Sequence, residues 1–149
     1  MLRRFSFPLE QVRSLRSHKE AAAKAALAHE LTKQAEREAE LREADEAVAS
    51  ARGGTGEGAV LSGPELAARQ AFLERCERAR AAAELAAIEH ERLVAERMSA
   101  LQTAAAEREA LDRLKERHAA SHARAVARAE EATLGEVALF RHVRTEEAA

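Results

Sequence analysis

The amino-acid sequence predicts an all-α protein, folded as a long antiparallel two-helix coiled-coil hairpin. Three observations support this prediction. Alanine, the strongest helix former, supplies 38 of the 149 residues. Charged residues make up 34% of the chain and aromatic residues only 3%, which is typical of long helices and not of a compact core. Proline and glycine, which break helices, gather almost entirely at two places in the chain.

The first predicted element is a helix over residues 8–50. Pro8 stands at a position where a helix can begin, because the first turn does not need the N–H that proline lacks. Leu27, Leu41 and Val48 follow in steps of seven or its double. This spacing is the repeat of a coiled-coil seam, so the helix is expected to pack lengthwise against a partner.

The second predicted element is a glycine-rich loop over residues 51–63, which contains five of the six glycines. Its sequence GGTGEG, at 53–58, lacks the Lys-Ser/Thr pair and the preceding strand of a phosphate-binding loop. We therefore interpret it as a flexible connection that reverses the direction of the chain.

The third predicted element is a helix over residues 64–144. Ser62 and Glu65 have the spacing of a capping box, which marks a helix start. The helix carries a second heptad series, formed by Leu66, Leu73, Ala87, Val94 and Leu101. If the helices fold back at the loop, the numbers of facing residues add up to about 114, so Leu41 should face Leu73 and Leu27 should face Ala87. Residues 1–149 are then interpreted as a single hairpin.

This pairing predicts that the first helix covers the second only as far as about Ala106. The remaining stretch, from about Glu107 to Arg144, would have no partner inside the chain, yet it carries Leu111, Leu114, Leu134, Leu139 and Val143. An apolar stripe left in water promotes association, so we interpret this tail as a partner-binding surface. A frayed helix and a homodimer seam are the alternatives.

The sequence contains no convincing catalytic, cofactor or metal site. His118 and His122 have the i,i+4 spacing of a two-histidine metal site, but the glutamate that usually lies between such histidines is absent. Cys76 lies near two arginines without a histidine close in sequence to act as its base, and we interpret it as a seam residue. The chain is therefore predicted not to be an enzyme.

Charge and cysteine content restrict the partners and the compartment. A net charge of −2 argues against nucleic-acid binding, although Arg108–Arg128 has a local excess of three positive charges that could favour an acidic protein surface. A single cysteine fits a reducing compartment. No stretch approaches 18 apolar residues and no signal-peptide pattern opens the chain, which predicts a cytoplasmic protein without an integral membrane span.

Phe72 is the most informative of the few aromatic residues. It lies one residue before Leu73, at the flank of the predicted seam. An exposed phenylalanine at that place would be a candidate anchor for a protein partner. Burial at the edge of the seam is the alternative.

Three segments resemble the flagellar export J protein (FliJ) family. The opening residues are FSFPLEQVRSLRSHKEAAAKAALAHEL, the second helix opens on RQAFLERCERA, and the chain closes on EREALDRLKERHAASHARAVARAEEATLGEVALFRHVR. The resemblance runs nearly end to end. It implies a non-enzymatic coiled-coil stalk of the flagellar type III protein export apparatus, peripherally associated with the cytoplasmic membrane at the flagellar base.

The resemblance also implies partners and contact residues. The partners would be the hexameric export ATPase, the cytoplasmic domain of the export gate, and substrate chaperones. Phe72, Cys76 and Ala79, with Leu73 beside them, would meet the export gate. Phe5, Phe7 and the tail from about Leu111 would meet the ATPase ring. A stalk subunit of another secretion system or rotary ATPase, or a generic coiled-coil scaffold, would fit the same pattern.

Overall fold

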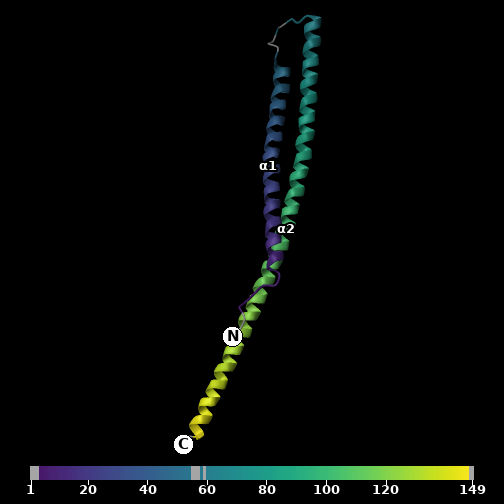
Figure 1. The fold of residues 1–149 in the computed structure, drawn as a ribbon. Helices are drawn as coiled ribbons and strands as arrows, with labels where there is room; N and C mark the ends of the chain where they lie inside the picture. The colour runs from purple at the N-terminus through teal and green to yellow at the C-terminus, as the bar shows by residue number, and fades with distance from the viewer. Residues whose placement is uncertain (1–3, 55–57, 59, 148–149) are drawn as a thin grey trace. The chain divides into compact units, whose positions relative to one another are not determined.

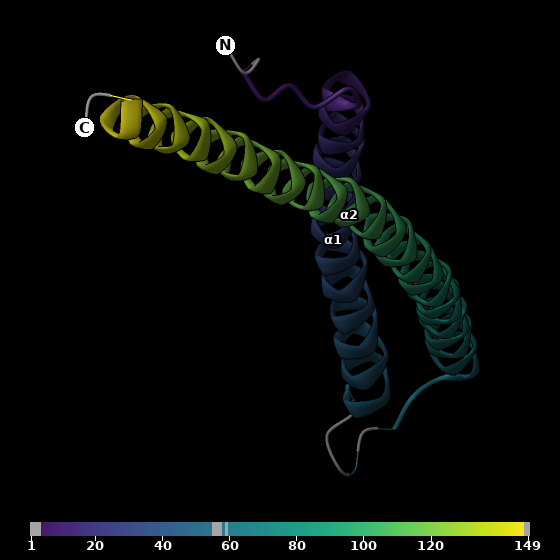
Figure 2. The ribbon, with the colours of Figure 1, turned by 90° about the horizontal axis from the view of Figure 1, so that it is seen from below.

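The structure, a computed structural model, describes residues 4–54, 58 and 60–147. It consists of two helices, α1 over Glu10–Gly53 and α2 over Gly63–Glu147, with no strand among the residues described. The C-terminal end of α1 and the N-terminal end of α2 lie at the same end of the helix pair (Figures 1 and 2). The prediction of an all-α, two-helix hairpin is confirmed.

The helix boundaries follow the local signals closely. Pro8 and Leu9 form a turn before α1, in which the Glu10 N–H donates to the Phe7 carbonyl oxygen at 3.2 Å. At the start of α2, the Ser62 N–H donates to the Glu65 carboxylate at 2.8 Å, and the Glu65 N–H donates to the Ser62 hydroxyl oxygen at 3.4 Å. These are the two bonds of the predicted capping box. The backbone bond from Ser62 also lowers the pKa of Glu65.

The connection between the helices is shorter than the predicted loop, because α1 continues to Gly53. Gly58 has φ of 100°, a left-handed conformation that residues with a Cβ rarely adopt. Residues 55–57 and 59, which belong to the predicted loop, lie outside the described residues.

The contacts group into two units, and each is described by itself. Unit 1 contains Met1–Lys19 and Ala105–Ala149, and unit 2 contains Glu20–Ala104. In unit 2 the buried apolar residues are Leu27, Val48 and Ala51, which share one face of α1. The facing series on α2 is half-buried at Leu73, Ala87, Val94 and Leu101, as the heptads predict, whereas Leu66 is exposed.

The register of the two helices in unit 2 differs from the predicted one. Glu30 pairs with His90 and Asp45 pairs with Arg80, so the numbers of paired residues add up to 120 and 125 and not to about 114. Leu41 accordingly lines one groove with Glu84 and Ile88, and does not face Leu73. The prediction was wrong because alanine-rich seams pack almost equally well in several registers. The heptad positions alone do not distinguish these registers, whereas the polar pairs across the seam do.

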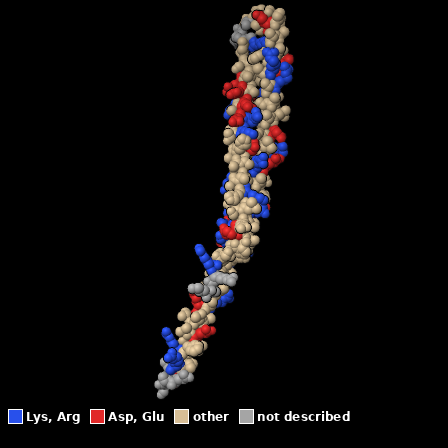
Figure 3. Space-filling view, in the orientation of Figure 1, with Lys and Arg blue, Asp and Glu red and all other residues tan. Residues whose placement is uncertain are grey.

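Polar residues in the seam of unit 2 are paired across it. Arg80, which occupies a core position of the heptad, donates to the Asp45 carboxylate, and Arg52 donates to Glu77 at 2.7 Å. His90 and Glu30 are the most buried of these residues, with side chains 11% and 14% exposed. Acidic and basic side chains are intermixed along both helices of this unit (Figure 3).

Candidate partner-binding surfaces

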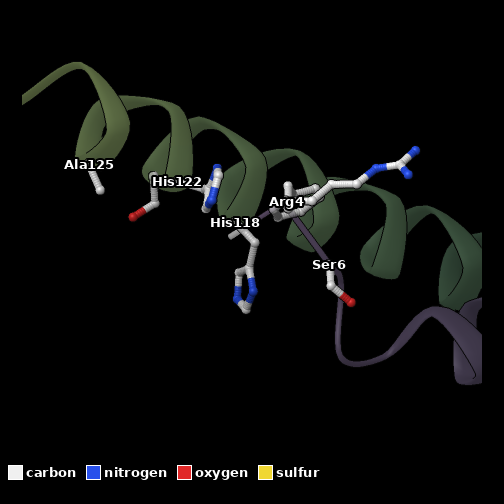
Figure 4. A pocket seen from close by; sticks show the side chains of 7 residues that line it. Arg4, Ser6, His118, His122 and Ala125 are labelled. Carbon is white, nitrogen blue, oxygen red and sulfur yellow. The ribbon is translucent and has the colours of Figure 1, made fainter. Parts of the chain in front are cut away.

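The N-terminal segment of unit 1 packs on α2 through two aromatic contacts. Phe7 is 6% exposed, and its ring meets the ring of His118 edge-on with centroids 5.7 Å apart. Phe5 is half-buried, and its ring lies 5.6 Å from that of His122. Figure 4 shows both histidines on consecutive turns of α2, beside the segment that carries Ser6. Phe5 and Phe7 are therefore occupied inside the chain in this conformation.

His118 and His122 are also the two residues whose spacing in the sequence suggests a possible metal site. Each ring is packed against a phenylalanine ring, His118 against Phe7 and His122 against Phe5. Among the residues that the structure describes, no group of three or more His, Cys, Asp or Glu side chains is placed to hold a metal ion.

Ion pairs extend the contact between α1 and α2 in unit 1. Lys115 donates to the Glu10 carboxylate at 2.7 Å, and Arg13 donates to Asp112. Lys115 lowers the pKa of Glu10, and Arg13 lowers the pKa of Asp112. A further pair joins Arg16 to Glu107. Of these contacts, only the pair of Lys115 with Glu10 neutralises a positive charge of the segment Arg108–Arg128.

These ion pairs overturn the predicted limit of helix pairing. The first helix was expected to cover the second only to about Ala106, but contacts from Glu10, Arg13 and Arg16 reach α2 residues 107–115. Leu111 and Leu114 lie in this stretch and are half-buried. The two leucines are thus part of the packing of unit 1, and the unpartnered tail begins later than predicted.

The most exposed large apolar side chains of unit 1 lie near the C-terminal end of α2. Leu134, Leu139 and Val143 are 69%, 65% and 50% exposed. Phe140, which the sequence analysis did not select, is 75% exposed and forms a shallow apolar hollow with Leu139 and Val143. Phe140 stands outside the stripe of leucine and valine that predicts the tail surface, although an aromatic residue next to Leu139 is a visible signal. We call residues 134–143 the tail patch.

In unit 2, Phe72 is exposed and not buried at the edge of the seam. Its side chain is 49% exposed, and the Arg75 guanidinium lies over its ring at 5.7 Å from the centroid. Ala79, two helical turns further on the same flank, is also exposed, whereas Leu73 and Cys76 are half-buried in the seam. The four predicted gate residues therefore divide into an exposed flank and a seam that supports it.

A comparison with protein-family models assigns the chain to a family. A family model described as "Flagellar FliJ protein" matches residues 5–147, nearly the whole sequence. The chain belongs to the FliJ family. The matched range includes all three segments that resemble the family, and it covers Phe5, Phe72 and the tail patch. No curated protein and no solved structure was found to match the chain.

Membership of the FliJ family makes this chain a component of the flagellar protein export apparatus, and the family is a non-catalytic part of that apparatus. Its general partners are other parts of the export apparatus. Among the described residues, neither helix contains a window that is apolar enough to cross a membrane.

Proposed function

We propose that this FliJ-family chain is the non-enzymatic stalk that couples the hexameric export ATPase to the export gate and to substrate chaperones. It would work in the cytoplasm, peripherally associated with the membrane at the flagellar base. The observation that carries the proposal is the tail patch, a cluster of large apolar side chains that the packing of unit 1 does not use. Leaving them in water is unfavourable, and a protein partner that covers them recovers that free energy.

The tail patch is proposed as the surface that meets the ATPase ring. It is a short stretch of one helix in which apolar residues stand beside one acidic and one basic residue, Glu136 and Arg141. Such a surface can contact similar subunits of a ring in turn without a strong preference for one of them. Phe5, Phe7, Leu111 and Leu114 take part in this proposal indirectly, because their packing in unit 1 holds the helix that carries the patch.

Phe72 and Ala79 are proposed as the export-gate surface, with Leu73 and Cys76 behind them. An exposed aromatic ring stacked under an arginine offers a preorganised anchor, because its rotamer is already restricted before binding. The seam residues Leu73 and Cys76 contribute by fixing the position of that flank on α2.

Truncation and substitution test the tail assignment. A chain that ends after Ala132 keeps His118 and His122, and so keeps the contacts of Phe5 and Phe7. We expect it to remain helical but to lose binding to the purified hexameric export ATPase and stimulation of its activity. The double variant Leu139→Gln/Phe140→Gln should have the same effect at full length. Leu15→Gln, at a side chain that is 54% exposed in the same unit, is the matched control and should stimulate normally.

A second variant separates the two surfaces. Phe72→Ala should weaken binding to the cytoplasmic domain of the export gate by about tenfold, which is the loss expected for truncation of a central aromatic anchor. It should leave ATPase stimulation unchanged. Full stimulation by the truncated chain would refute the tail assignment. If the tail variants instead abolish a homodimer seen by sedimentation, the patch is a self-association seam.

A further inference from the structure

A groove in unit 2 belongs to neither of the partner-binding surfaces proposed above. Its volume is about 270 Å³, and α1 and α2 both contribute to its walls. The lining residues used below are Gln34, Glu38, Leu41, Glu84, Ile88 and Glu91. All of them lie within unit 2, where Leu41 belongs to the seam series of α1, and none belongs to the Phe72 flank or the tail patch.

The rim of this groove places like charges on both sides of the seam. Glu38 comes from α1, and Glu84 and Glu91 come from α2. Residues at the flanks of a coiled coil normally pair opposite charges across the helices, because like charges there are unfavourable. Arg80 compensates Glu84 at 3.2 Å, whereas the hydrogen bond that Glu38 accepts comes from the neutral amide of Gln34. The groove therefore keeps a negative rim.

The surroundings of the groove reinforce this sign. Residues 20–104 contain 16 acidic and 11 basic side chains, which gives this part of the sequence a net charge of 11 − 16 = −5. An acidic helix, a nucleic acid or an anionic membrane surface is repelled by this field, and a basic segment is attracted.

Apolar side chains also line the groove. Ile88 is 58% exposed although it lines the groove, and the neighbouring Leu85 is 69% exposed. Both lie on α2 outside the seam series of Ala87 and Val94, so the pairing of the two helices does not need them. An apolar strip beside carboxylates is complementary to an amphipathic helix, which buries its apolar stripe in a groove of this kind.

We propose that this groove docks a helix of another protein that carries an apolar stripe bordered by lysine or arginine. The helix would lie alongside α1 and α2, with its stripe over Leu41 and Ile88 and its cations toward Glu38, Glu84 and Glu91. The charge of the rim determines the sign of the partner, and the exposed apolar strip determines its amphipathic character. This docking surface is independent of the ATPase and gate surfaces proposed above.

Two synthetic amphipathic peptides test the proposal with the full-length chain. They share one leucine stripe and differ only in its borders, which are lysine in the first and glutamate in the second. We expect the lysine peptide to bind, as measured by fluorescence anisotropy, at least about tenfold more tightly than the glutamate peptide. Ile88→Gln and the triple variant Glu38→Gln/Glu84→Gln/Glu91→Gln should each weaken this binding by about tenfold or more.

A matched triple variant distinguishes the groove from general charge attraction. Glu36→Gln/Glu43→Gln/Glu46→Gln removes the same charge from exposed positions of α1 that do not line the groove. It should bind the lysine peptide almost as tightly as the parent chain. Thermal unfolding by circular dichroism should show that the groove triple variant melts close to the parent chain. Glu84→Gln removes the ion pair with Arg80, whereas Glu38→Gln and Glu91→Gln relieve like-charge repulsion.

Three results would overturn the proposal. If the two triple variants lose the same amount of affinity for the lysine peptide, the peptide is attracted by net charge alone. If the two peptides bind with equal affinity, the carboxylates of the rim do not contribute to binding. A concentration-dependent dimer of the parent chain, lost in the groove triple by sedimentation, would show that a second copy occupies the groove.

Discussion

The pair of Glu30 and His90 is the strongest test of how the alanine-rich seam is held in register. The His90 Nε2 atom lies 3.0 Å from the Glu30 carboxylate and 3.1 Å from the Glu30 carbonyl oxygen. Both side chains are nearly buried, at 11% and 14% exposed. His90→Ala removes a hydrogen bond to a charged group, worth about 1.5–3 kcal/mol, together with the packing of the ring.

We therefore expect His90→Ala to lower the free energy of unfolding by about 2–3 kcal/mol, or roughly 30- to 150-fold in the unfolding equilibrium constant. Urea unfolding followed by circular dichroism measures this change. His29→Ala, at the exposed neighbour of Glu30, is the control and should change stability by less than about 0.5 kcal/mol.

The double variant Glu30→Leu/His90→Leu sharpens the test. Two leucines at nearly buried seam positions replace a pair that requires desolvation, and such replacements are neutral or stabilising by about 1–4 kcal/mol. We expect the double variant to unfold at a higher urea concentration than the parent chain. If it is less stable than His90→Ala, or if His90→Ala is as stable as His29→Ala, the pair of Glu30 and His90 does not hold the two helices in register.

Three further predictions concern register, acid sensitivity and the tail. Val48→Cys should form an intrachain disulfide with Cys76 on oxidation, because the observed register brings these two seam positions together; cross-links formed only between chains would contradict it. Because the pKa values of Glu10 and Asp112 are lowered in the folded chain, their ion pairs contribute stability above the ordinary carboxyl pKa of about 4 and lose it as the pH falls through the lower folded-state values. NMR contacts between the N-terminal segment and α2 should therefore weaken below a pH of about 4, and contacts unchanged at a pH of about 2 would refute this. Gly135→Ala should stabilise the helix of the tail by about 0.5–1 kcal/mol, because alanine favours the helix more than glycine does and the added Cβ meets no atom within 4 Å. Amide exchange measures this gain.

The helices themselves were predictable because their signals are local. Ser62 and Glu65 form the capping box that their spacing predicts, and the heptad positions Leu27 and Val48 are buried. Each of these features depends on residues a few positions apart, which the sequence displays directly. The observed helix ends differ from the predicted ones by only a few residues. At the start of α1 the difference arises because Pro8 lies in the turn before the helix and not in its first turn.

The register and the candidate surfaces were harder to predict, because they depend on contacts between distant residues. The sequence placed Leu111 on an unpartnered tail, but the N-terminal segment continues the pairing beside it through Glu10 and Arg13. The heptad pattern alone does not state which charged residues will pair across the seam, and so it does not fix how far one helix is displaced along the other. The exposure of Phe72 was left open for the same reason and required coordinates.

Alanine in the seam also explains why larger apolar residues of this protein are left exposed and available to partners. An alanine layer buries little surface, so the seam gains specificity from polar pairs such as Glu30 with His90 and Arg80 with Asp45. Residues such as Ile88 and Phe140 lie outside that arrangement and contribute little to the pairing of the helices, yet each exposes more than half of its side chain to water. A chain whose own fold leaves its larger apolar side chains uncovered is suited to holding other proteins, because those side chains gain their favourable burial only when a partner is bound.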